Sequence, residues 1–76
     1  AAVISVAPNP ATVFAEVGGL KAGSRVSLVD INGKVCYRGT AESGKLTLDV
    51  SGLAAGVYFV RVSDGTETAV RKLVVK

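Results

Sequence analysis

The sequence predicts an all-β domain, an antiparallel sandwich of about seven short strands. Apolar and polar residues alternate with a period of two along most of the chain, which is typical of strands with one buried face. Turn signals interrupt this alternation about every eight to twelve residues, a spacing typical of immunoglobulin-like sandwiches. Apolar spacings of three and four, which would indicate a helix, are never sustained over two turns.

Turn residues separate the predicted strands. The first strand ends at Pro8, Asn9 and Pro10, because two prolines remove backbone donors and fix an extended turn. A glycine-containing loop at residues 18–23 precedes the third strand, and a short turn at residues 42–44 precedes the fifth. The predicted strands cover residues 2–6, 12–17, 25–30, 35–40, 45–50, 57–63 and 67–76.

Two hairpins are predicted with particular clarity. Between the third and fourth strands, the Asn32-Gly33 pair tolerates positive φ angles, and Asp30 can cap the turn through its carboxylate. Between the sixth and seventh strands, Asp64-Gly65 is the turn signal. We therefore expect Asp30 and Gly33, like the Pro-Asn-Pro segment, to shape the fold rather than to contact a partner.

The same alternation predicts which residues fill the core. In the fifth strand, Leu46, Leu48 and Val50 face inward, and Leu53 in the following loop closes one end of the core. The pattern also places Val26 and Leu28 on one face of their strand. In the sixth strand it places Tyr58, Val60 and Val62 on one face, and Phe59 and Arg61 on the other.

The composition narrows the class of protein. A chain of 76 residues holds one small domain, which we expect to be a fragment of a larger protein. Nine Lys and Arg residues oppose six Asp and Glu residues, and the basic residues are scattered along the sequence, so we expect no nucleic-acid partner. No apolar run approaches the roughly 18 residues of a membrane span, so we expect no direct membrane insertion.

The sequence offers little for catalysis or metal binding. It contains no His to serve as a base, and its six carboxylates occur singly. Asp30, Asn32 and Gly33 match only part of a calcium-loop pattern, and a hairpin turn accounts for them better. Cys36 lies within a predicted strand, where we expect it to be an apolar filler. We therefore predict no enzyme, no metal and no cofactor.

Four segments, taken in order, resemble one known family. One contains the Pro-Asn-Pro sequence, the next the predicted Asn-Gly turn, the third Gly56 and Tyr58, and the last the C-terminal strand. They cover residues 7–12, 26–35, 53–62 and 71–76. Together they resemble the C-terminal sorting domain of type IX secretion, the system of Bacteroidetes bacteria such as Porphyromonas. Two positions depart from the family's pattern: Ala7 stands where an aromatic residue often precedes the prolines, and Cys36 where an ordinary strand residue is usual.

The resemblance implies a single non-catalytic sorting domain over residues 1–76, at the C-terminus of a larger cargo protein. In this family the cargo first enters the periplasm, and an outer-membrane barrel shuttle receives the sorting domain. A sortase-like cysteine protease usually removes the domain and attaches the cargo to an anionic lipopolysaccharide. The implied destination is the outer-membrane surface or the extracellular space.

The last strand is our candidate for the element that a receptor reads. A terminal strand can leave one side of a sheet open, and a partner strand can pair there through backbone hydrogen bonds. The same edge predicts edge-paired or strand-swapped homodimers. We expect Leu73 and Val75 on one face of this strand and Lys72, Val74 and Lys76 on the other. The predicted recognition residues are Arg71, Lys72, Leu73, Val74, Val75 and Lys76, with Gly56 and Tyr58 supporting the edge.

Two further functions stay open at the level of the sequence. A carbohydrate-binding sandwich presents aromatic rings to sugars, and the chain contains Phe14, Tyr37, Tyr58 and Phe59, of which we expect Tyr58 to lie in the core. A structural spacer domain is the other alternative, although a spacer has no need of a strand at the chain terminus. An enzyme is the third and weakest alternative.

Overall fold

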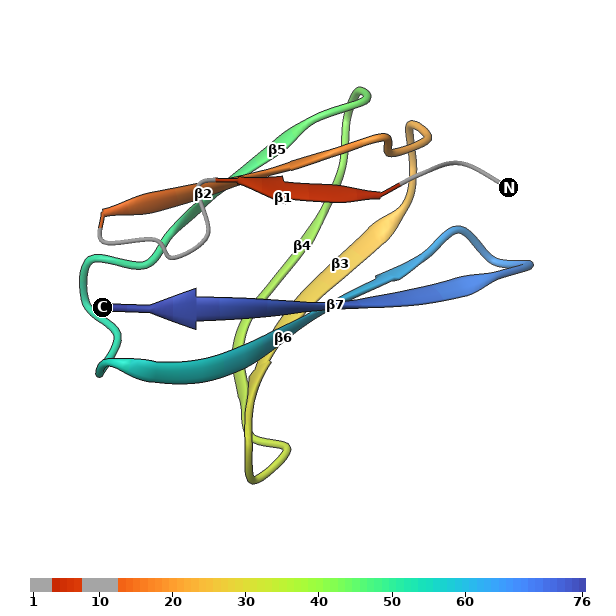
Figure 1. Cartoon of the computed structure of the whole chain (residues 1–76). Helices are drawn as coiled ribbons and strands as arrows, with labels where there is room; N and C mark the ends of the chain where they lie inside the picture. Colours follow the sequence, from red (N-terminus) through yellow and green to blue (C-terminus); the bar gives the residue numbers. More distant parts are fainter. Residues whose placement is uncertain (1–3, 8–12) are drawn as a thin grey trace.

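The computed structural model describes residues 4–7 and 13–76, which form seven strands and no helix (Figure 1). The strands make two antiparallel sheets, one with the order β1-β2-β5 and the other with the order β4-β3-β6-β7. The predicted all-β sandwich is confirmed. The strands are β1 (Ser5–Ala7), β2 (Phe14–Gly18), β3 (Arg25–Asp30), β4 (Val35–Thr40), β5 (Leu46–Asp49), β6 (Gly56–Ser63) and β7 (Thr68–Val75).

The core lies between the two sheets and is almost entirely aliphatic. Successive side chains of a strand point to opposite faces, so alternate residues of β3 and β6 reach the core, whereas in β7 only Leu73 and Val75 are buried. Leu46 is only half-buried, because it lies at the end of its strand. The side chains that are at most 3% exposed include Ala15, Val17, Val26, Leu28, Leu48, Val50, Val60, Leu73 and Val75.

The turn between β3 and β4 is capped by Asp30 as predicted, but of the Asn32-Gly33 pair only Gly33 has a positive φ. The Asp30 carboxylate accepts hydrogen bonds from the backbone N–H groups of Asn32 and Lys34, both at 2.9 Å. Gly33 has a φ of 85°, a conformation that glycine adopts without the steric cost that a Cβ would bring. A bulge between Leu28 and Val29 then shifts the pairing of the two strands by one residue.

Several strand boundaries differ from the predicted ones. Gly18 was predicted in a loop, but it extends β2 by pairing with Ser5, and Gly56 begins β6 by pairing with Val75. Lys76 was predicted in the last strand, which ends at Val75. The reason is that strand ends depend on backbone pairing with a neighbouring strand, which side-chain alternation does not report. The predicted turn at Pro8, Asn9 and Pro10 lies outside the described residues.

No helix long enough or apolar enough to cross a membrane occurs within residues 4–7 and 13–76.

Candidate functional site

The C-terminal strand β7 is the last strand of the four-stranded sheet, where it pairs antiparallel with β6 along its whole length (Figure 1). In this register Leu73 lies opposite Tyr58, and Val75 lies opposite Gly56. The residues that the sequence singled out in β6 and β7 are therefore direct cross-strand neighbours. The structure brings together two segments that are separated by a hairpin in the chain.

The two faces of β7 have different environments. Leu73 is fully buried and Val75 is 3% exposed, so both side chains belong to the core. Lys72 and Lys76 are exposed, and Val74 is half-buried. Because the apolar face is occupied by the core, a partner that meets the folded domain can contact the outward face and the free edge of this strand but not its apolar face.

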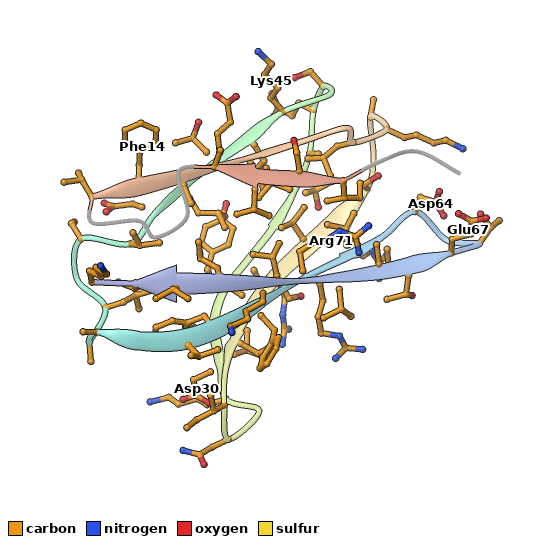
Figure 2. The ribbon with its side chains drawn as sticks, viewed as in Figure 1. Phe14, Asp30, Lys45, Asp64, Glu67 and Arg71 are labelled. Atoms are coloured by element: carbon orange, nitrogen blue, oxygen red, sulfur yellow. The ribbon has the colours of Figure 1, made fainter. Side chains whose placement is uncertain are left out.

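Arg71 connects β7 with the N-terminal part of the chain. Its Nε donates a hydrogen bond to the carbonyl oxygen of Ile4 at 3.3 Å, and one Nη donates to the carbonyl oxygen of Val70 at 2.9 Å. Figure 2 shows the Arg71 side chain pointing from β7 toward β1. Arg71 thus links the two sheets, a role that the sequence did not predict because no local pattern relates two residues so far apart.

The C-terminal strand has more contacts than the sequence predicted. Besides the bond from Arg71 to Ile4, Lys72 and Val74 also have interaction partners within the chain. Edge pairing between two copies of the domain stays a prediction.

Tyr58 holds the loop that precedes β6. Its hydroxyl donates a hydrogen bond to the carbonyl oxygen of Ala54 at 2.6 Å, and its side chain is only 7% exposed. A tyrosine that bonds to backbone a few residues upstream is a recurrent device at the corners of β-sandwiches. Tyr58 therefore positions the loop and the start of β6, next to the end of β7, from within the core.

The hairpin between β6 and β7 is organised by one carboxylate. Asp64 Oδ1 accepts hydrogen bonds from the backbone N–H of Glu67 at 2.8 Å, and from the backbone N–H and the hydroxyl of Thr66, both at 2.9 Å. These bonds lower the pKa of Asp64 to about 2, with the Glu67 N–H as the largest cause. Lys21 lies 3.8 Å from the other carboxylate oxygen and acts in the same direction. Asp64 and Glu67 mark this turn in Figure 2.

The hairpin should lose stability in acid through Asp64. Because folding lowers the pKa of this carboxyl, its charge contributes stability that is complete above about pH 4 and is lost as the pH falls toward 2. The variant Asp64→Asn has no charge to lose. We therefore expect the melting temperature of the native protein to exceed that of the variant at pH 7, and the difference to shrink between pH 4 and pH 2. Thermal unfolding followed by circular dichroism measures both.

The hydrogen bonds from Ser51 lower the pKa of Asp49 as well, but Asp49 is present in both proteins and cancels in the comparison. A difference in melting temperature that stayed constant down to pH 2 would contradict the role of the Asp64 charge.

Cys36 and Asp30, two further side chains with reactive groups, are engaged in packing and in a turn. Cys36 is half-buried, packs against the core and lies with its Sγ 3.7 Å from the carbonyl oxygen of Lys34. The Asp30 carboxylate is bonded to its own turn. Within the part of the chain that the structure describes, no three His, Cys, Asp or Glu side chains are grouped so that they could hold a metal ion.

These features define a small antiparallel β-sandwich module whose C-terminal strand is an integral part of the core. The family model described as the secretion system C-terminal sorting domain matches residues 5–76. The chain belongs to this family, the C-terminal sorting domains of type IX secretion. A search of curated protein sequences finds no match.

Two solved structures contain similar domains. One is PorZ, described as an essential bacterial surface component of the type IX secretion system of Porphyromonas gingivalis, with a TM-score of 0.89 and 25% identity. The other is the BSP domain of a biofilm-associated protein, with a TM-score of 0.69 and 27% identity. Each match covers 96% of this chain, but only 11% of the PorZ chain and 14% of the other. The similarity therefore concerns one domain of much longer proteins.

Proposed function

We propose that residues 1–76 form a single sorting domain that directs a cargo protein, fused before it, from the periplasm across the outer membrane by type IX secretion. The family match over residues 5–76 is the observation that carries this proposal. The similarity to a domain of PorZ, a surface component of that system, supports it. In this function the folded domain is a sorting signal that the secretion system recognises, and it has no catalytic role.

We propose further that the outward side of β7 is what the outer-membrane shuttle reads. The argument rests on the two faces of the strand. Leu73 and Val75 are held in the core, which fixes the position of the strand, and the side chains of Lys72 and Lys76 are exposed. Exposed charges in fixed positions steer a partner and set its orientation more than they add affinity. Arg71, Gly56 and Tyr58 then act by positioning the strand. After transit, a sortase-like cysteine protease would cut before the domain.

The test is a fusion that is exported or retained. Residues 1–76 are appended to a periplasmic fluorescent protein in a bacterium with type IX secretion, and fluorescence is measured at the cell surface and in the medium. We expect export that disappears in a strain without the translocon. Retention of a folded fusion in the periplasm of the competent strain would overturn the proposal.

The double variant Lys72→Gln and Lys76→Gln tests the role of β7 within this assay. Removing two exposed charged contacts should reduce export about fivefold or more, because each such contact contributes up to about 1 kcal/mol. The matched control is the double variant Lys21→Gln and Lys45→Gln, which removes the same charge from exposed lysines outside β7. If both double variants lower export equally, net charge and not β7 is what the system senses.

The carbohydrate-binding alternative finds little support in the placement of the aromatic rings. Phe14 is half-exposed on β2 in the three-stranded sheet, and Phe59 lies on β6 in the other sheet. Tyr58 is buried, and Tyr37 packs against the core. The four rings therefore do not form one surface that a sugar could stack upon. A fusion that folds but stays in the periplasm would favour the spacer alternative.

A further inference from the structure

The outer face of the four-stranded sheet gathers three arginines that are far apart in the sequence. Ser27 on β3 lies opposite Arg38 on β4 and opposite Arg61 on β6. Arg25 is two residues before Ser27 on the same strand, so it is a diagonal neighbour of both other arginines, at about 7–8 Å between Cα atoms. We call Arg25, Arg38 and Arg61 the arginine face. Figure 1 shows the three strands that carry it side by side.

Strand alternation explains why these arginines point away from the core. Val26 and Leu28 on β3, and Val60 and Val62 on β6, are buried between the sheets. Their neighbours along each strand must face the opposite way. All three arginines are exposed, and together they line a shallow hollow of about 720 Å³ on the outer face.

The arginine face has no counter-charge in the part of the chain that the structure describes. No Asp or Glu lines the hollow, and the two ion pairs found among the described residues join lysines to Asp64 and Glu16. The three guanidinium groups also make no side-chain hydrogen bond there. Solubilising surfaces normally mix both signs of charge, and like charges on adjacent strands repel one another. The three positive charges of the arginine face therefore repel one another, and an anionic partner would offset this repulsion.

Apolar side chains surround these charges. Val35 is 41% exposed and Val70 is 48% exposed, and the sheet register places Val70 opposite Arg61. Phe59, half-buried, lies opposite Val29, which lines the hollow. Arginine and aromatic residues with apolar neighbours are typical of protein–protein interfaces. A ligand made only of phosphate groups would contact the charges and leave the apolar groups in water.

We propose that the arginine face docks an acidic, extended segment of a partner protein, in which carboxylates at alternate positions are followed on the same side by apolar side chains. The planar guanidinium fork binds a carboxylate through two parallel hydrogen bonds. In an extended segment, residues i and i+2 lie about 7 Å apart on the same side, which matches the diagonal spacing of the arginines. Lys72 borders this surface, because it lies opposite Phe59 and two residues after Val70, which is opposite Arg61. The inference is therefore tested by binding to the isolated chain and not by export.

The experiment titrates the 76-residue chain with a short synthetic peptide in which two Glu residues and then two Val residues occupy alternate positions, with Ser between them, so that Glu and Val share one side. Binding is followed by NMR, through backbone amides and arginine Nε–H groups. We expect saturable binding, with shifts confined to the outward-facing residues of β3, β4 and β6 and to Val70 and its outward-facing neighbours on β7. The same peptide with Gln in place of Glu should not bind. Shifts elsewhere on the chain, or no saturation, would overturn the proposal.

Charge-matched variants separate the arginine face from net charge. The triple variant Arg25→Gln, Arg38→Gln and Arg61→Gln should bind the Glu peptide at least about tenfold more weakly. The control triple variant Lys21→Gln, Lys34→Gln and Lys45→Gln loses the same charge and should bind as the native chain does. Equal weakening in both would overturn the proposal.

Two further arms keep the test decisive. Replacing the three arginines with lysine keeps the charge and the fold but removes the planar guanidinium groups. We expect this variant to bind the Glu peptide more tightly than the arginine-to-glutamine variant and more weakly than the lysine-to-glutamine control. This variant serves if the glutamine variant does not fold. Inorganic tripolyphosphate is titrated as the competing anion. If it binds the arginine face more tightly than the Glu peptide does, the ligand is a phosphate compound, and the proposed protein partner is wrong.

Discussion

Replacing Leu73 with alanine is expected to destabilise the domain by about 3 kcal/mol, within the range of about 2–5 kcal/mol for buried leucines. Leu73 is fully buried and lies opposite Tyr58, so truncation leaves a cavity between the sheets. A domain of 76 residues has a total stability of about 4–11 kcal/mol, so the loss is a large part of it. Unfolding in urea, followed by circular dichroism, measures the free energy.

Val70→Ala is the matched control within the same strand. Val70 is 48% exposed, and substitutions at such surface positions change stability by about 0.5 kcal/mol or less. If Leu73→Ala and Val70→Ala had the same small effect, Leu73 would not be packed as the structure shows. The export assay should follow stability, with Leu73→Ala reducing export when the domain unfolds at the growth temperature.

Removing residues 71–76 is expected to unfold the domain and to abolish export, leaving the cargo in the periplasm. The deletion removes Leu73 and Val75 from the core. It also removes the strand segment that pairs with β6 from Gly56 to Val60. Each buried aliphatic side chain contributes about 1.5–3 kcal/mol, and the lost backbone hydrogen bonds add to this. The sum is comparable with the total stability given above. Circular dichroism and the dispersion of NMR amide signals report the unfolding.

Deletion of Lys76 alone is the control for this truncation. Lys76 is exposed and lies beyond the end of β7, so its removal should leave the fold intact. A chain lacking residues 71–76 that still unfolds cooperatively at the native midpoint would contradict the structure. Because the large deletion removes both the fold and the signal, only the Lys72 and Lys76 variants can show which side chains are read.

The predictable part of the fold is the part that local chemistry decides. Asp30 and Gly33 predict their turn because a carboxylate that accepts backbone N–H groups and a residue without Cβ are what that turn requires. Leu48 and Val50 were placed in the core correctly, because a strand with one buried face must alternate. Strand ends at Gly18 and Gly56 were missed because they depend on which strand lies alongside.

The candidate site divides in the same way. The alternation that puts Leu73 and Val75 on one face of β7 was readable in the sequence, but that this face lies in the core was not. The Arg71 bond to Ile4 was not readable either, because it joins the two ends of the chain across the sheets. The basic residues are scattered along the sequence, whereas the folded sheet brings Arg25, Arg38 and Arg61 onto one face. In the sequence, these arginines are only three separate positions in three predicted strands. They become neighbours once the order of the strands in the sheet is known.

The sequence by itself determined the all-β class, the hairpins, the division of several strands into two faces and the family to which the chain belongs. Those properties follow from residues close in the chain or from motifs in a fixed order. Only the tertiary structure decided the strand order, the contact between Arg71 and Ile4 and the arginine face. Strand order is set by the packing of whole sheets, and a surface shared by three strands exists only once that packing has placed them side by side.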